Sequence, residues 1–516
     1  MSFLTSLEQY QTDNIFGGSF NDTDLSSIEK ALEARSITGR ETTDSTSASG
    51  APLKAESLEK NLKLLTFRLN DIRLFRDMPN SPAYNTVEEF AQLVSYGDFN
   101  GGGSGFITEG SLPGTEDSVY RRRAELVKYM GVTKAVTHPM QLVKTAVEIG
   151  SIVQQEVNNA TMWILRACNR ALTFGNAATQ PVQFNGIFAQ HQTYSEEASY
   201  DAYMNSAMVI DLRGSCMTQS TINDASQTIL YPGYGTPTTF YGSPKMLGEF
   251  GKDFFTKQRI MLGSTGTNIS GFTAGGYPKT VSTVAGEIEL KFDVLMQENR
   301  VKYLTTAGTT NAPGAVTKGT GVGSSAAIAV SSTDTLTKFG AASFGDANGA
   351  GDYYYAIAAT NAYGESALTL LNTNNTTAIT ATATTSIDMS FVDGGGSYPA
   401  TAYVVYRTKK GATGGNAMPF YPLFTVSKAE VTAGYDGGGA GVVRDRNRFL
   451  PDCEQGFVAD FTADVLMWKQ LAPLMKIDLA RIDLSTRFAT VLYGTPQLYA
   501  PKKLVRIINA GPYRAS

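Results

Sequence analysis

Two consecutive stretches decide how this chain folds: GDFNGGGSGFITEGSLPGTEDSVYRRRAELVK (residues 97–128) and PMQLVKTAVEIGSIVQQEVNNATMWILRACNRALTF (residues 139–174). The first is polar and rich in glycine, which favours a hairpin. The second repeats apolar residues at steps of three and four, which is typical of an amphipathic helix. These residues are Leu142, Ala146, Ile149, Val153, Val157, Ala160, Ile164, Ala167 and Ala171. We therefore predict one continuous helix over about residues 139–174, about 50 Å long at 1.5 Å per residue.

Signals at both ends support this helix. Thr137 is placed to cap it, and Pro139 falls in the first turn, where a missing N–H does no harm. Gly175 and Asn176 can adopt the left-handed conformation that ends many helices. Gly150 weakens the helix by about 1 kcal/mol relative to alanine, so tertiary contacts must hold it together.

The hairpin has little to bury on its own. It contains the runs GGGSG (101–105), FITEG (106–110) and LPG (112–114) and few apolar residues. Because an isolated two-stranded ribbon is marginally stable in water, we expect it to lie on its own body or on a neighbouring copy, and we favour the neighbour.

The densest basic run of the chain is Arg121, Arg122 and Arg123, at the end of this hairpin. In a strand, Arg122 points to the opposite face from the other two. Two interpretations stay open: a solvated ribbon, or a clamp on an acidic neighbour. As contacts between subunits we predict Phe106, Glu109, Arg121, Arg122 and Arg123.

The remaining sequence is mixed in character. Residues 1–52 are polar, and residues 53–76 favour a helix with Leu58, Leu62, Leu65 and Leu69 on one face; residues 87–96 favour another short helix. From 184 to about 304 the pattern is mixed α/β, with a strand at 238–241, a helix opening at Ser243 and Pro244, and a strand at 287–298. Residues 306–445 are rich in Ala, Thr, Gly and Ser, and we predict strands at 351–366, 401–411 and 420–428.

Composition excludes several classes of function. Lys plus Arg number 43 and Asp plus Glu 47 in 516 residues, for a net charge of -4, which argues against a dedicated nucleic-acid binder. Three distant cysteines (Cys168, Cys216 and Cys453) make no disulfide framework and suit a reducing cytoplasm, with Cys168 in the core. We find no apolar run long enough to span a membrane and no signal peptide, and we expect a soluble protein that stays inside the cell that makes it.

We predict no enzyme, no cofactor and no metal. The two histidines, His138 and His191, are far apart in sequence, and His138 is better explained as a residue at a helix start. The triglycine at 101–103 is not followed by the lysine of a phosphate-binding loop, so a hairpin tip explains it better.

The order of these parts resembles that of the major capsid proteins of tailed bacteriophages, which have the Hong Kong 97-type fold. The local matches are FITEG at 106–110, LVKYMGVTKAVT at 126–137 and FGNAATQPVQFNGIF at 174–188, followed by the closing segment at 457–510. The resemblance covers roughly residues 50–300 and 446–516.

This resemblance implies an α+β fold of the Hong Kong 97 type with an inserted all-β domain. The implied parts are an N-terminal arm (1–52), arm-base helices (53–96), an extended hairpin loop (97–128), a peripheral domain with the spine helix (129–200), the first part of an axial domain (201–305), the insertion (306–445), and a return to both domains (446–516). The insertion resembles immunoglobulin or fibronectin type III β-sandwiches, on the run GDYYYAIAATNAYGES at 351–366. Glycan binding, decoration and the locking of capsomers stay open as its roles.

The implied function is that of a structural shell subunit. Such a subunit would form hexamers and pentamers of itself, assemble in the host cytoplasm with a scaffolding protein, a portal and in some cases a cementing protein, and enclose double-stranded DNA in the virion through weak, non-specific contact. Some relatives weld subunits through a lysine of the hairpin, but residues 97–127 contain no lysine, so we expect non-covalent stabilisation. The alternatives are a bacterial nanocompartment shell of the encapsulin type and a surface-binding protein that uses the β-sandwich.

Overall fold

The computed structural model describes residues 66–97, 108–112, 117–142, 151–196, 208–257, 278–296, 301–322, 327–331, 349–382, 385–481 and 483–513. Apart from Leu142 and Ser151, they belong to one compact unit. The predicted N-terminal arm (1–52) and the tip of the predicted hairpin lie outside these residues.

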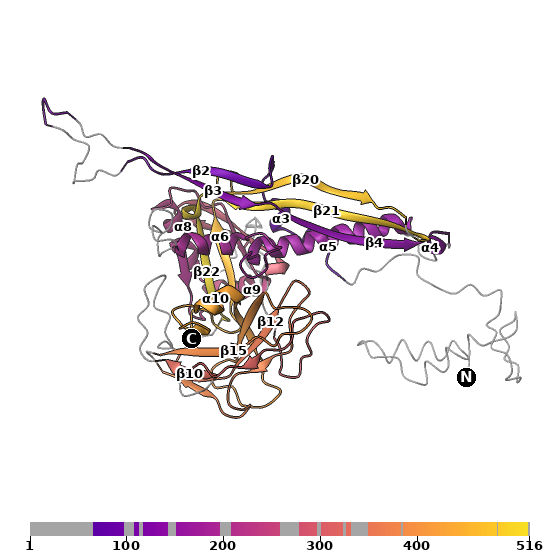
Figure 1. The fold of residues 1–516 in the computed structure, drawn as a ribbon. Helices are drawn as coiled ribbons and strands as arrows, with labels where there is room; N and C mark the ends of the chain where they lie inside the picture. The colour runs from indigo at the N-terminus through magenta and orange to yellow at the C-terminus, as the bar shows by residue number, and fades with distance from the viewer. Residues whose placement is uncertain are drawn as a thin grey trace, which may run out of the picture. The chain divides into compact units, whose positions relative to one another are not determined.

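A six-stranded mixed sheet forms one half of the core (Figure 1). Its order is β5 (Val209–Asp211), β22 (Leu504–Ala510), β19 (Glu454–Ala459), β6 (Thr239–Gly242), β8 (Gly286–Phe292) and β7 (Thr280–Thr283). The helices α8 (Gln219–Leu230) and α9 (Pro244–Lys257) pack on it. The predicted strand at 238–241 and the predicted helix at Ser243 and Pro244 are thus confirmed. The predicted strand at 287–298 ends early, because η3 (Val294–Met296) follows β8.

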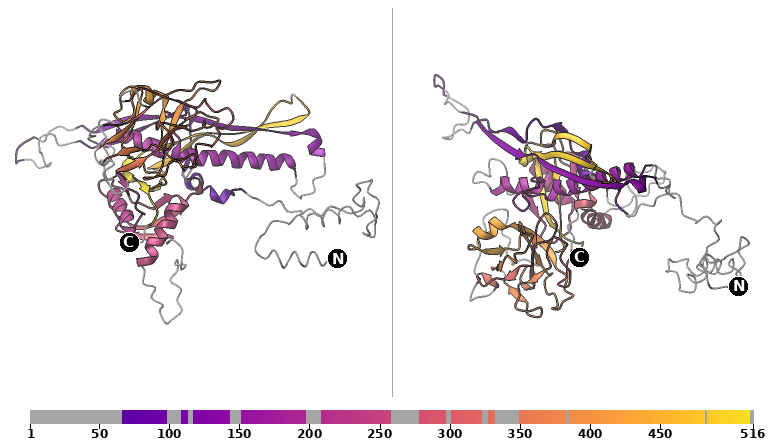
Figure 2. Two further views of the ribbon diagram at one scale, coloured as in Figure 1. Left: turned by 90° about the horizontal axis from the view of Figure 1, so that it is seen from below. Right: turned by 45° about the vertical axis from the view of Figure 1, so that its right-hand side comes forward.

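A second, four-stranded sheet holds the longest strands. Its order is β1 (Asn80–Pro82), β20 (Leu466–Asp478), β21 (Ser485–Leu498) and β4 (Lys128–Thr137). Helix α5 (Ile152–Phe174) runs along β4 and β21, as both views of Figure 2 and Figure 1 show, and α6 (Ile187–Glu196) packs beside it. Ile164 and Leu172 of α5, Trp468 of β20 and Phe457 of β19 belong to one apolar cluster, so the two sheets share a core.

The prediction of one continuous helix over 139–174 is wrong. Residues 138–142 form α4 (His138–Leu142), Ser151 is not helical, and α5 begins at Ile152; residues 143–150 lie outside the description. The pair Gly150 and Ser151 explains the break, since glycine disfavours helix interiors and serine favours helix ends. The 23 residues of α5 span about 35 Å rather than 50 Å.

The apolar stripe of α5 drifts from the predicted one. Ala160 and Ile164 are buried as predicted, but the stripe continues through Cys168 and Leu172, whereas Ala167 is exposed. The expected place of Cys168 in the core is therefore confirmed. The helix ends at Phe174 without a left-handed Gly175, whose φ is not positive. A Cβ on Gly175 would lie 2.5 Å from the carbonyl oxygen of Ala171, so close packing is what requires glycine there.

The predicted arm-base helices are wrong wherever they are described. Residues 66–77 contain only two short turns, η1 (Leu69–Asp71) and α3 (Leu74–Asp77), and the expected helix at 87–96 is the strand β2 (Val87–Ser95). The apolar residues of this segment fit both the helical and the strand periodicity; they lie at 87, 90, 91, 93 and 94. Pairing with β3 (Val119–Leu126) makes the segment a strand.

Residues 306–445 form two main sheets. One has the order β13 (Thr369–Leu370), β12 (Tyr355–Thr360), β16 (Ala402–Arg407) and β17 (Tyr421–Ser427). The other has the order β10 (Ile328–Ser331), β15 (Ser386–Val392) and β18 (Val442–Asp445), and β9 (Thr317–Lys318) also pairs with β15. A short pair, β11 (Gly351–Tyr353) with β14 (Ile379–Ala381), lies apart from both. The three predicted strand regions all contain strands, and those at 401–411 and 420–428 are neighbours as expected. Side chains from both sheets, among them Ile357, Val405 and Met389, meet in one cluster.

Candidate assembly surface

The base of the hairpin is held firmly to the body of the chain. β2 and β3 pair in antiparallel register, and one face of the ribbon lies on β21 and α6. The ring of Phe90 meets that of Tyr499 edge to face, with 4.8 Å between centroids. The guanidinium of Arg123 lies over the ring of Tyr194 at 4.2 Å, and Gln92 donates to the Tyr194 hydroxyl at 3.0 Å. These contacts fix the direction in which the hairpin leaves the body.

The opposite face of the ribbon is exposed and largely apolar. The side chains on it come from alternate residues that face each other across the two strands. They are Val87, Glu89, Ala91 and Leu93 of β2, and Leu126, Ala124, Arg122 and Tyr120 of β3. Leu93 is 42% exposed, Leu126 53% and Tyr120 69%. We call this set the outer hairpin face. Exposed apolar surfaces are frequent at sites of interaction between proteins.

The predicted contact residues fall in three places. Arg122 lies on the outer hairpin face and forms a salt bridge with Glu89 of its own chain. Arg123 lies on the inner face, as the alternation predicted, and Arg121 and Glu109 are exposed. Phe106 lies outside the described residues. Their role as contacts between subunits stays a prediction, and the acidic partner of Arg122 in this structure is Glu89 of the same chain.

A second apolar face, in part exposed and in part half-buried, lies on the long sheet, on the side away from α5. Register places Met475 of β20 beside Val491 of β21 and Gly131 of β4, and Ile477 beside Ala489 and Thr133. The rings of Tyr129 and Tyr493 meet edge to face on the same side, 5.2 Å apart. We call this set the outer sheet face. Sequence analysis missed it, although the alternation in LAPLMKIDL (471–479) is a signal that could have revealed it.

One titratable group stands out at the base of the hairpin. Glu125 of β3 lies on the inner face, where Asn185 donates to its carboxylate at 3.4 Å. Burial raises the pKa of Glu125 to about 7, against the opposing effects of that hydrogen bond and of Arg123. A carboxyl group whose pKa is raised toward neutrality therefore lies at the base of the hairpin.

No catalytic or metal centre is found among the described residues. They contain no cluster of His, Cys, Asp and Glu side chains that could hold a metal ion. His191 is buried, its Nε2 lies 3.3 Å from the carbonyl oxygen of Leu504, and burial lowers its pKa to about 3. Nor do the described helices include one long and apolar enough to cross a membrane.

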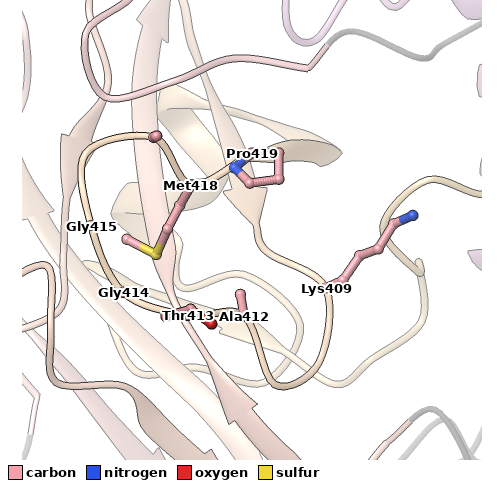
Figure 3. Close-up of a pocket in the computed structure, with 8 residues that line it drawn as sticks. Lys409, Ala412, Thr413, Gly414, Gly415, Met418 and Pro419 are labelled. Atoms are coloured by element: carbon pink, nitrogen blue, oxygen red, sulfur yellow. The ribbon is translucent and has the colours of Figure 1, made fainter.

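The loop between β16 and β17 encloses a small pocket of about 390 Å³ (Figure 3). Its walls are mostly apolar or backbone, with Met418 and Pro419 at one side, and its single charged side chain, Lys409, is bound to Asp452 at 2.5 Å. A pocket without convergent polar groups offers no general acid, base or nucleophile. This pocket therefore carries no catalytic site, and the two apolar β faces remain as candidate interaction surfaces.

Comparison with known proteins agrees with an assembly role. No family model matches the chain. The major capsid protein of Staphylococcus phage S25-3 is 23% identical over 478 residues, which cover 92% of this chain and 93% of that protein, and the major capsid protein of Staphylococcus phage K matches to the same extent.

Solved structures were compared as well. The capsid of the cyanophage P-SCSP1u gives a TM-score of 0.40 at 7% identity, with 96% of this chain and 100% of that chain covered. An encapsulin from Synechococcus elongatus gives 0.39 at 9% identity, with 90% and 95% covered. Over most of its length the chain is thus similar in sequence to phage major capsid proteins, which are structural proteins and not enzymes.

Proposed function

We propose that this chain is the major capsid protein of a tailed phage, with a Hong Kong 97-type fold, and that it assembles into the icosahedral shell around the double-stranded DNA genome. The sequence similarity over 92% of the chain supports this proposal. The single structural observation that carries it is the presence of two exposed apolar β faces on one chain, the outer hairpin face and the outer sheet face.

Two different complementary faces on one chain favour closed rings. When the hairpin of one copy covers the sheet of the next, each contact is heterologous, and a suitable rotation closes the ring into hexamers or pentamers. Covering the faces removes Leu93, Leu126, Met475 and Ile477 from water, and each apolar side chain contributes on the order of 1–2 kcal/mol when fully buried. The same interface repeats in every copy.

The shell would be held together without covalent links between subunits. The hairpin from 97 to 127 contains no lysine that could form an isopeptide bond. A net charge of -4 suits weak, non-specific contact with packaged DNA. Assembly in the host cytoplasm would involve a scaffolding protein and a portal, and the mature protein would be located in the virion.

We further propose that residues 306–445 are an inserted β-sandwich of the immunoglobulin or fibronectin type III kind on the exterior of the shell. The shared apolar cluster between the two sheets supports a sandwich. Both connections to the remaining chain are well anchored. Lys302 forms a β-bridge with Phe420 on the way in, and Asp452 binds Lys245 and Lys409 on the way out.

Electron microscopy of the purified chain, expressed alone and with its scaffolding protein, tests the shell role. We expect closed shells or capsomer rings from the unmodified chain and from Val392→Glu, which adds a charge at an exposed apolar residue of β15. We expect monomers from the double variant Leu93→Glu and Leu126→Glu, which places charges on the outer hairpin face. Monomers from the unmodified chain both alone and with its scaffolding protein, or unchanged rings from the double variant, would contradict the proposal.

A further inference from the structure

Several edges of the described sheets are protected against pairing with another chain, whereas the β4 edge of the long sheet is not. An exposed edge strand carries unpaired N–H and C=O groups, and natural proteins usually protect it with short length, proline, bulges or charges. In the six-stranded sheet the edge strands β5 and β7 have only three and four residues. In the sheets of residues 306–445, β10, β13 and β18 are equally short, and β17 carries Pro422 and a register shift.

The long sheet shows the contrast within a single structure. Beyond its short contact with β1, the β20 edge contains Pro473 and two register shifts. The opposite edge is β4, with ten residues, no proline and an unbroken register against β21 from Lys128 to Thr137. Its outward side chains, Tyr129, Gly131, Thr133, Ala135 and Thr137, are exposed and uncharged. None of the usual protections is present on that face of β4.

The two lysines of β4 do not protect the edge. Both lie on the inner face of the sheet, toward α5. Lys134 forms a salt bridge with Glu156 of α5 at 3.2 Å, and Lys128 donates to the carbonyl oxygen of Pro181 at 2.6 Å. Their charges are therefore already engaged away from the edge.

We propose that β4 pairs antiparallel with β4 of a second copy, joining two sheets into one of eight strands. A two-fold axis perpendicular to the sheet keeps the outer faces of both copies on the same side. Side chains alternate between the two faces along a strand, so residues that pair across this axis are both odd-numbered or both even-numbered. We assign the register in which Thr133 lies opposite Thr133 of the second copy. Gly131 then faces Ala135, and Tyr129 faces Thr137.

Charge supports this register. Lys134 falls opposite Val132 of the second copy, and Lys128 lies beyond the paired residues, so no like charges meet. A Thr–Thr pair at the centre is favourable across strands. The contact is isologous and differs from the heterologous hairpin contact, so it can join copies from two different rings. The inference rests on the proposed function in one respect only, which is that many copies of this chain come together.

Disulfide trapping tests the pairing. Directly opposite residues in an antiparallel pair have Cα atoms about 4.5–5.5 Å apart, within reach of a disulfide. We expect Thr133→Cys to give a covalent dimer on mild oxidation, on a non-reducing gel. Ala489→Cys is the matched control: it lies on the same face one strand further in, about 14 Å from its own copy, and should stay monomeric. The unmodified chain is a second control, because any cross-link that it forms must come from Cys168, Cys216 or Cys453.

A charge pair gives an independent measurement. Thr133→Lys and Thr133→Glu should each abolish the β4–β4 contact, and a mixture of the two variants should restore it. Because Thr133 also belongs to the outer sheet face, Ala489→Lys and Ala489→Glu, on the same face one strand further in, are the matched controls, and mixing these two should restore nothing. Disulfide-linked dimers are measured on chains that have not assembled as well as on assembled particles.

The outcomes separate this inference from the shell role. Shells in which the Thr133→Cys variant forms no covalent dimer would overturn the edge pairing and leave the shell role intact. Covalent dimers without shells would support the pairing and contradict the shell role. Exchange protection of the β4 amides that point away from β21, in a Thr133→Cys variant that forms no covalent dimer, would assign the edge to another strand and overturn self-pairing.

Discussion

Glu88 of β2 lies directly opposite Glu125 of β3 at the base of the hairpin. Like charges at directly opposed positions destabilise a sheet. Two features relieve the conflict here. Glu88 accepts hydrogen bonds from the backbone N–H groups of Tyr84 and Asn85 at 2.7 and 3.1 Å. Burial raises the pKa of Glu125 to about 7, so that this carboxyl group is largely protonated in mildly acidic solution.

Glu125→Gln should change how stability depends on pH. The folded pKa of about 7 lies above the ordinary value of 4.5, so the folded state holds the proton more tightly. The stabilisation is complete below about pH 4.5 and is lost as the pH rises through about 7. We expect the variant to remove this loss and to be more stable than the unmodified chain at pH 8 by roughly 1–2 kcal/mol. Thermal unfolding from pH 5 to 8 measures it. Glu89→Gln, on the exposed face of the neighbouring strand β2, should keep the original slope; an unchanged slope in Glu125→Gln would refute the assignment.

Asp445→Asn should strongly destabilise residues 306–445. Asp445 and Arg407 are both buried and lie 2.8 Å apart, and Tyr355 donates to the same carboxylate at 2.8 Å. Removing one member of a buried ion pair leaves an uncompensated charge and costs about 3–5 kcal/mol. Calorimetry of the variant should show the corresponding transition at lower temperature. Asp388→Asn is a useful comparison, because its partner Arg444 is partly exposed; a loss as large as that of Asp445→Asn would show that burial does not set the cost.

Asp452→Asn should loosen the connection that follows residue 445. Burial alone would raise the pKa of Asp452, but hydrogen bonds with Lys245 and Lys409 outweigh it and lower the pKa, so the carboxylate stays charged at neutral pH. The neutral amide loses both ion pairs. We expect faster amide exchange and faster proteolysis between residues 446 and 453. Asp393→Asn, which breaks the ion pair with Lys428 on a different loop, should leave that segment unchanged. Equal rates of amide exchange and proteolysis in the unmodified chain and in both variants would contradict a role of the Asp452 ion pairs in holding this connection.

Two glycines should respond to alanine in opposite ways. A Cβ on Gly494 would lie 2.3 Å from the ring of Trp468, which is 1% exposed in the core, so Gly494→Ala should cost about 1–3 kcal/mol through overpacking. A Cβ on Gly248 would meet nothing within 4 Å, and this glycine lies inside α9. Gly248→Ala should therefore stabilise the chain by up to about 1 kcal/mol. Denaturant unfolding midpoints compare the two, and a neutral Gly494→Ala would contradict the packing described for Trp468.

Long amphipathic patterns and strong end signals were readable from the sequence. Helix-end chemistry predicts the end of α5 at Phe174 and the start of α9 at Pro244. Local periodicity predicts the strands β12, β16 and β17. Of the hairpin predicted at 97–128, only the second strand was readable as such, since β3 lies inside this range and its partner β2 lies before it, where a helix was predicted. These features depend on residues close together in the chain.

Other features were decided only by tertiary structure. The strand β2 carries a pattern that suits a helix equally well, and its pairing with β3, more than twenty residues later, made it a strand. The outer sheet face combines β4 with β20 and β21, which are separated by more than 300 residues. No single segment shows that its exposed side chains form one surface.

The sequence by itself therefore determined the helix end at Phe174, the helix start at Pro244 and the strands β12, β16 and β17, because short-range periodicity and residue chemistry suffice for these. Tertiary structure alone decided which faces stay uncovered, which edge of the long sheet stays unprotected, and where Glu125 becomes buried opposite Glu88. Burial, edge exposure and shifted pKa values depend on which distant segments meet, and that is fixed by the packing of the whole chain rather than by any local pattern.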